Sequence, residues 1–270
     1  MRLPKTSRGR CTQLGELILG KGDYVAGGSW SLPFLDLDDA RRRRPLIFGE
    51  VSDRPESYPE LLREMFSGRQ DDPEEWAVMW KEIGADGIWI DLNDGDTSLV
   101  ERIVSRTRLP VAVTSDPETL FELSGIRDST MILIGRDGTY DGDAGDHAVC
   151  VFGGDADSLS SGAEAVESSG CGKMILDLGG FDVGPELEDS IKRAEEVRSR
   201  ALSEEHGLRH PTMASTMKCW ERGFRDAREA SMWEAEAALS AMLSGTDIII
   251  MRGPGAADMA RVYGEELADL

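Results

Sequence analysis

The segment GIWIDLNDGDTSLVERIVSRTRLPVAV, residues 87–113, contains one complete structural unit. The run Gly87 to Leu92 is mostly apolar, which is typical of a strand buried on both faces. Leu99 to Arg106 then places apolar side chains at helical spacing, and Leu109 to Val113 is a second apolar run. A buried strand, a helix and another buried strand indicate a parallel βαβ unit.

The same unit recurs along the chain, because short apolar runs alternate with longer amphipathic stretches. The predicted strands are Pro45–Val51, Gly87–Leu92, Leu109–Val113, Met131–Ile134, His147–Phe152, Lys173–Asp177, Pro211–Ser215 and Asp247–Met251. The predicted helices are Pro73–Ile83, Leu99–Arg106, one that opens at Asp116–Pro117, Ser158–Ser168, Pro185–Glu205, one within Trp220–Ser244 that includes the residues from Ala230 on, and Ala256–Leu267. The stretch Gly135–Asp146 contains too many Gly and Asp residues for a full helix.

Eight such units close most naturally as a (β/α)8 TIM barrel, an α/β fold that uses about 250 residues as one domain. The chain has 270 residues and fits this size. We expect a short N-terminal extension at residues 1–44 and the barrel at residues 45–270. An open doubly wound sheet is the alternative, but no G-x-G-x-x-G turn follows the first predicted strand.

The composition limits the classes of partner. The formal net charge is −21 and the sequence pI is near 4.5, so phosphate backbones would repel the chain and no nucleic acid is expected to bind. The acidity is spread along the chain, which suits either a solvated surface in a salty cytoplasm or an acidic face for a basic partner. No apolar run of 18 residues is present and no apolar stretch follows the basic residues 1–10. A cytoplasmic location without membrane contact is the prediction.

The sequence contains none of the common catalytic or metal-binding motifs. The four cysteines form no CxxC pair and the three histidines have no metal-ligand spacing, so no metal site and no disulfides are expected. There is no Walker A, HExxH or nucleophile-elbow pattern. No lysine ends a predicted strand, which makes a Schiff-base aldolase the least favoured enzyme class. The identity of any catalytic residue stays open.

In a barrel of this kind, functional side chains gather at the C-terminal ends of the strands. That rule selects Glu50, Asp53, Asp91, Asn93, Thr114, Ser115, Arg136, Asp137, Gly153, Gly154, Asp177, Ser215, Thr216 and Arg252. Capping and solvation of the strand ends explain most of them. Asp91 and Asp177 stand at the ends of apolar strands, where an unpaired carboxylate is costly, so binding and structural roles weigh about equally for both. Arg252 is their candidate partner, or a candidate ligand for an anion.

Glycine-rich turns and tryptophans add weaker hypotheses. Gly179-Gly180 and Gly253-Pro254-Gly255 are candidate phosphate loops, although turn geometry explains them equally well. Trp76 and Trp80 lie four residues apart on one predicted helix, so we expect them in the core. Trp30, Trp220 and Trp233, near loops or helix starts, are candidate interface anchors.

Several segments, taken in their order along the chain, resemble one known family. Tyr24–Phe34 (YVAGGSWSLPF) resembles its GG-x-x-x-LPF segment before the barrel, and Asp72–Ala77 (DPEEWA) resembles its DP-x-x-WA helix start. Pro45–Asp53 with Tyr58–Leu62 resembles its first strand and loop, and Gly245–Arg252 (GTDIIIMR) its last strand. The chain is therefore similar to the delta subunit of the archaeal acetyl-CoA decarbonylase/synthase complex, a family related to the small subunit of the corrinoid iron–sulfur protein.

The resemblance implies a TIM barrel that pairs with a larger subunit carrying a corrinoid and an Fe–S cluster. Together they would pass a methyl group between a tetrahydropterin and the acetyl-CoA-forming metal centre. It also implies that this chain alone binds no cofactor or metal, and that it helps to enclose a cobamide held mainly by the partner. On this interpretation the candidate cofactor-binding residues at the strand ends are Asp177, Asp91, Asn93, Gly179, Gly180 and Arg252.

The family pattern is altered at the rim. After the sixth strand the family has MDPTT, whereas Leu176–Gly184 here reads LDLGGFDVG and keeps only Asp177. After Arg252 the usual histidine is replaced by Gly253. For Asp177 we expect an ionised carboxylate that is held by the Gly179–Gly180 turn or by Arg252.

Two other functions stand beside the complex-subunit hypothesis. One is a stand-alone methyltransferase barrel that binds a methylated pterin through Asp91, Asn93 and Asp177. The other is a non-catalytic paralogue that acts as a scaffold.

Overall fold

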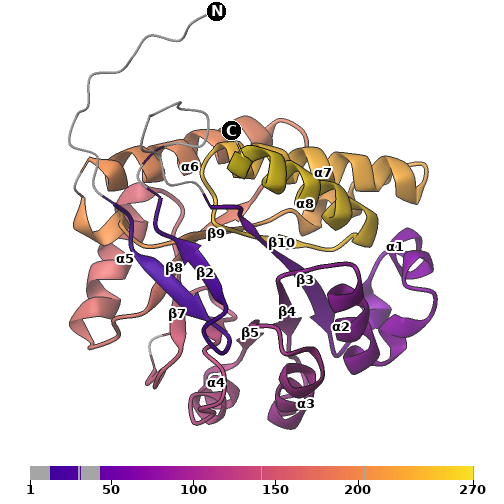
Figure 1. Cartoon of the computed structure of the whole chain (residues 1–270), viewed down its shortest axis with the longest axis horizontal. Coiled ribbons are helices and arrows are strands. Elements are labelled where there is room, and N and C mark those ends of the chain that lie inside the picture. Colours follow the sequence, from indigo (N-terminus) through magenta and orange to yellow (C-terminus); the bar gives the residue numbers. More distant parts are fainter. Residues whose placement is uncertain (1–12, 30, 32–42, 141, 204, 270) are drawn as a thin grey trace, which may run out of the picture.

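The computed structural model describes residues 13–29, 31, 43–140, 142–203 and 205–269. Eight parallel strands close into a barrel in the order β10-β3-β4-β5-β6-β7-β8-β9, and helices surround it (Figure 1). The strands are β3 (Leu46–Ser52), β4 (Gly87–Asp91), β5 (Val111–Ser115), β6 (Ile132–Gly135), β7 (Ala148–Phe152), β8 (Met174–Gly180), β9 (Thr212–Ser215) and β10 (Ile248–Met251). The predicted TIM barrel is confirmed, and the open-sheet alternative is wrong.

The helices lie where amphipathic stretches were predicted, with shifted ends, except for the one at Glu60–Met65, which was not predicted. They are α1 (Glu60–Met65), α2 (Pro73–Glu82), α3 (Thr97–Thr107), α4 (Pro117–Leu123), α5 (Ala156–Ser168), α6 (Glu186–Leu202), α7 (Ala227–Leu243) and α8 (Pro254–Asp269). The helix expected within Trp220–Ser244 begins at Ala227, because Asp226 caps it by accepting from the Glu229 N–H. Trp220 lies in the short 3-10 helix η4 (Met217–Glu221). Short 3-10 turns also occur at Pro55–Ser57, Arg69–Asp71 and His206–Leu208.

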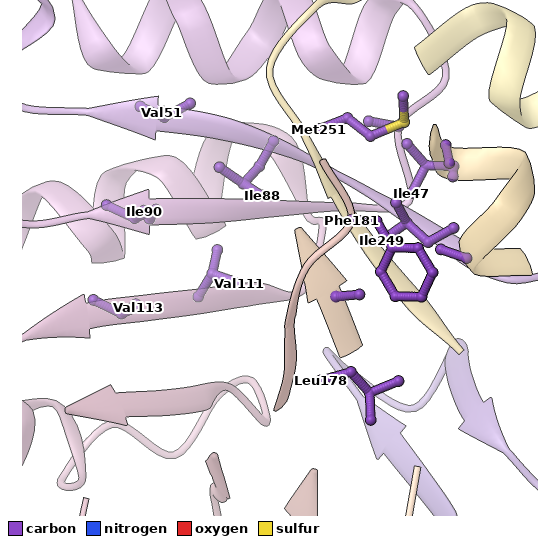
Figure 2. Packing of buried hydrophobic residues seen from close by; sticks show 14 of the residues in the cluster. Ile47, Val51, Ile88, Ile90, Val111, Val113, Leu178, Phe181, Ile249 and Met251 are labelled. Atoms are coloured by element: carbon purple, nitrogen blue, oxygen red, sulfur yellow. The ribbon is translucent and has the colours of Figure 1, made fainter. Parts of the chain in front are cut away.

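Side chains of each barrel strand alternate between two cores. Ile47, Val51, Ile88 and Ile90 belong to the large cluster that also contains the helix residues (Figure 2). Trp76 and Trp80 of α2 are fully buried in that cluster, as predicted. The intervening strand residues, Phe48 and Ile250 among them, form a second cluster inside the barrel. This period of two follows from strand geometry, and it decides which polar residues face the barrel interior.

A β-hairpin closes the N-terminal end of the barrel. Strands β1 (Glu16–Leu19) and β2 (Tyr24–Gly27) pair antiparallel, and Leu17, Leu19 and Ala26 join the interior cluster of the barrel. Figure 1 shows the hairpin lying across the barrel. These two strands were not predicted from the sequence, because their burial depends on the barrel that they close. The division into residues 1–44 and 45–270 stays a prediction.

Some sequence predictions fall on residues of which nothing is described. Trp30 and residues 32–34 of the family-like segment lie outside the described residues. Within the described ranges, no helix has both the length and the apolar character needed to cross a membrane.

Candidate ligand-binding site at the barrel mouth

A cavity of about 430 Å³ opens at the C-terminal ends of the strands. Its walls come from seven of the barrel strands and the segments that follow them. The lining residues are Trp89, Thr114, Ile134, Gly135, Arg136, Asp137, Gly138, Phe152, Asp177, Gly179, Gly180, Met213, Ser215, Met217, Lys218, Glu221, Ile250 and Arg252. Four of the six predicted binding residues are in this set, and Asp91 and Asn93 are not. Gly153 and Gly154, two of the rim residues, are also absent from it.

Asp177 places a carboxylate in the cavity wall. Its neighbour Gly179 donates its backbone N–H to Oδ1 at 2.7 Å, as expected. Gly179 has a φ of +75°. Residues that carry a side chain rarely adopt this backbone conformation, so the position suits a glycine. Burial raises the pKa of Asp177 to about 6, while the Gly179 hydrogen bond and the charge of Arg193 pull it down. No described residue donates a hydrogen bond to the second oxygen, Oδ2. A ligand with N–H groups has a free acceptor there.

Thr114 adds a second polar group without a protein partner. It lines the same cavity from β5, and its Oγ1 is buried with no hydrogen-bond partner among the described residues. A buried hydroxyl that is left unsatisfied is unfavourable. A bound molecule could satisfy it.

Asp91 and Asn93 form a brace beside the cavity. Asn93 donates from Nδ2 to Asp53 Oδ1 at 2.9 Å and to Asp91 Oδ2 at 3.1 Å. Arg136 donates to Asp91 Oδ1 at 3.2 Å and to the Leu92 carbonyl at 2.6 Å. The donor groups of the Asn93 amide are therefore occupied by protein acceptors. The brace positions Arg136, which does line the cavity.

Arg252 does not pair with Asp91 or Asp177, which corrects the sequence-based expectation. It forms a two-point ion pair with Glu50, one contact of which is Nη2 to Oε1 at 2.9 Å. Glu50 is 2% exposed because it points into the barrel from β3. The Arg252 guanidinium also lies 4.8 Å from the centre of the Tyr58 ring. Since Glu50 already neutralises it, Arg252 is a poor candidate for gripping an anion.

Glu234 of α7 is a buried acceptor that the sequence did not reveal. It receives hydrogen bonds from Thr216 Oγ1, Trp220 Nε1 and the backbone N–H groups of Arg252 and Gly253. Burial raises its pKa to about 7, while these four donors lower it. The carboxylate ties α7 to the ends of β9 and β10. Trp220, proposed as an interface anchor, is instead 4% exposed and bound to Glu234, whereas Trp233 is 47% exposed.

Lys218 is a cavity residue that the strand-end rule did not select. No lysine ends a strand, but η4 carries Lys218 to the cavity wall only three residues after β9 ends. The sequence pattern did not predict the turn at Thr216 that brings Lys218 to the cavity wall. Among the described residues, no group of three or more His, Cys, Asp or Glu side chains could hold a metal ion.

Comparison with known proteins gives the family. Residues 25–260 match the family model of the CO dehydrogenase/acetyl-CoA synthase delta subunit. A curated relative is the acetyl-CoA decarbonylase/synthase complex subunit gamma 1 of Methanosarcina thermophila, 29% identical over 103 residues, which are 38% of this chain and 22% of that subunit. The chain thus spans about a fifth of the length of the curated relatives it matches.

Solved structures support the fold. Dihydropteroate synthase from Thermus thermophilus superposes with a TM-score of 0.59 at 18% identity, covering 95% of this chain and 100% of that one. Dihydropteroate synthase from Xanthomonas albilineans in complex with 7,8-dihydropteroate gives a TM-score of 0.51 at 17% identity, with 92% and 98% covered. At such identities the likeness shows the barrel fold alone. By its match over residues 25–260, the chain belongs to the CO dehydrogenase/acetyl-CoA synthase delta subunit family.

Proposed function

We propose that this chain is the TIM-barrel subunit of a corrinoid-dependent methyl-transfer system of the acetyl-CoA decarbonylase/synthase type, and that its mouth binds a tetrahydropterin. The observation that carries the proposal is the Asp177 carboxylate, which is held by Gly179 at one oxygen and faces the cavity. Family membership supports the reaction class, and the site supports the ligand.

The chemistry of the cavity suits a pterin ring. One edge of a pterin carries two adjacent donors, the 2-amino group and N3–H, and a carboxylate accepts such a pair. The Thr114 hydroxyl is free to donate or accept at a second point. The cavity volume of about 430 Å³ falls within the range of about 300–1,000 Å³ for small-molecule sites. One of the structural neighbours was solved with 7,8-dihydropteroate bound, a molecule that contains this ring.

A cobamide fits this chain only at the rim. Its corrin ring is much larger than a pterin, so it would cover the mouth while a partner holds most of its surface. Lys218 and Glu221, both exposed lining residues, would then face it. The cobalt of a cobamide supplies a site that accepts and releases a methyl group. The contribution of this chain would be to orient the pterin below the rim and to exclude water.

The partner is also part of the proposal. The curated relatives are subunits of acetyl-CoA decarbonylase/synthase complexes, which favours a hetero-oligomer with a corrinoid- and Fe–S-carrying subunit in the cytoplasm. A stand-alone pterin methyltransferase and a scaffold without ligand are separated from it by the two experiments below.

Calorimetric titration with tetrahydrofolate tests the ligand. We expect wild type to bind and Asp177→Asn to bind about tenfold or more weakly, because a hydrogen bond to a charged acceptor is weakened. Asp182→Asn is the matched control, since Asp182 is a partly buried carboxyl just after the end of β8 that does not line the cavity. If wild type releases no heat, the mouth is not a pterin site and the scaffold function gains support.

Affinity capture from the native source, followed by mass spectrometry, tests the partner. We expect a corrinoid protein or a carbon monoxide dehydrogenase component to be retained. Binding of the pterin without capture of either would favour the stand-alone methyltransferase.

A further inference from the structure

Phe152 is an exposed aromatic residue in the wall of the cavity. It is the last residue of β7, it is 48% exposed, and it lines the same cavity as Asp177. The two preceding inward residues of the strand, Ala148 and Cys150, are fully buried inside the barrel. The alternation of the strand therefore turns the Phe152 ring toward the mouth rather than toward the helices.

Phe152 stands directly beside Asp177. The two residues are paired in register across β7 and β8, so their side chains leave neighbouring strands on the same face, about 5 Å apart. A carboxylate binds the edge of a flat heterocycle in the plane of its ring. A side chain one strand away is then placed to contact the face of that heterocycle.

The backbone around Phe152 is fixed by its neighbours. Its N–H donates to Thr139 Oγ1 at 3.2 Å. Gly138 packs so closely that a Cβ there would lie 2.6 Å from the Phe152 Cβ, and a Cβ at Gly179 would lie 3.9 Å from Cε2 of the ring. The ring thus stands between two glycine-bearing turns. A side chain at Gly138 would collide with Phe152, so the glycine there leaves room for the ring, while the distance at Gly179 is an ordinary van der Waals contact.

We infer that Phe152 is the stacking platform for the bicyclic ring whose edge Asp177 holds. The ligand class is a pterin, and the inference rests on the proposed function. An aromatic ring left half exposed in a concave site gains its contact surface from a bound ring. Phe152 contacts the ring face and sets the plane in which the Asp177 carboxylate receives the two N–H donors.

Calorimetry with 6-methyl-5,6,7,8-tetrahydropterin and with tetrahydrofolate tests the inference. The first probe is little more than the ring, so a loss shared by both probes assigns the contact to the ring. We expect Phe152→Ala to weaken both by about 5- to 100-fold, as for a base that loses an aromatic stacking partner. Phe152→Tyr should keep wild-type affinity, because the ring face is retained. Phe121→Ala is the matched control, since Phe121 is a 62% exposed phenylalanine of α4 that does not line the cavity.

The outcomes separate this inference from the proposed function. If wild type binds both probes and Phe152→Ala binds them equally well, the stacking role is wrong while the pterin site stands. If Phe152→Ala loses only tetrahydrofolate affinity, the ring is not the stacked group and the inference fails. If wild type binds neither probe, both proposals fail. The melting temperature of Phe152→Ala should match wild type, which shows that the loss is not one of folding.

Discussion

The two ends of the barrel are built from the same strands and differ in the polarity of the side chains that face the barrel interior. At the N-terminal end, the hairpin β1–β2 buries Leu17, Leu19 and Ala26 against an apolar interior. At the C-terminal end, Asp177 and Arg252 line an open cavity. The change occurs within two residues of a strand, as from Phe48 to Glu50 on β3 or from Ile175 to Asp177 on β8. The N-terminal end, closed by the hairpin, contributes stability, and the C-terminal end is available for binding.

The largest effect is expected at the mouth, at the Glu50–Arg252 pair. Arg252→Ala leaves a nearly fully buried carboxylate without its partner, which costs about 3–5 kcal/mol. Urea unfolding at neutral pH measures this loss in the free energy of unfolding. Arg225→Ala, which removes an exposed pair with Glu229, should leave the unfolding midpoint unchanged. A small loss for Arg252→Ala would mean that the mouth is not held by charge.

At the N-terminal end of the barrel, removing buried apolar volume from the hairpin should lower the stability of the fold. Leu19 is fully buried between the hairpin and the barrel interior, so Leu19→Ala should reduce the free energy of unfolding by about 2–5 kcal/mol. Ile18→Ala is the control on the other face of the same strand, where the side chain is 53% exposed. Equal effects at the two positions would show that the hairpin does not plug the barrel.

Asn93→Ala should lower the stability of the fold and leave ligand binding at the mouth unchanged. The amide of Asn93 bonds to Asp53 and Asp91, so its loss should cost about 1 kcal/mol. The affinity for tetrahydrofolate should stay close to that of wild type, because Asn93 does not line the cavity. A large loss of affinity at unchanged stability would restore Asn93 as a ligand contact.

Asp177 should also make the stability of the fold depend on pH. The pKa of Asp177 in the folded chain is about 6, above the unfolded value of about 3.9. The folded state therefore holds the proton more tightly, and the contribution of Asp177 to stability is fully present below pH 4 and lost as the pH rises through 6. Wild type should lose stability relative to Asp177→Asn between pH 4.5 and 7.5, as unfolding midpoints in urea would show. A constant difference would contradict the raised pKa.

The sequence predicted the barrel because each strand is a near-continuous apolar run and each helix has its own periodicity. The hairpin was missed because its arms are short and their burial depends on the barrel that they close. The position of Asp177 at the mouth was predictable from the strand-end rule.

Other parts of the site needed the folded chain. Glu234 lies in the middle of a helix with mostly small residues, and its role depends on Trp220 and on two backbone N–H groups of the β10 end. The pairing of Arg252 with Glu50 joins residues 202 positions apart. Phe152 ends an apolar strand and is indistinguishable in sequence from a core residue, and only the register with Asp177 sets it apart.

The affinity of tetrahydrofolate as a function of pH tests the central claim most directly. If the ionised Asp177 carboxylate holds the ligand, about one tenth of the sites are competent at pH 5 and nearly all at pH 7.5, given a pKa of about 6. We predict that the affinity of wild type rises about tenfold between these two pH values. Asp177→Asn should bind weakly at both and correct for protonation of the ligand itself. Equal affinity of wild type at pH 5 and pH 7.5, or the same rise in Asp177→Asn, would contradict the account.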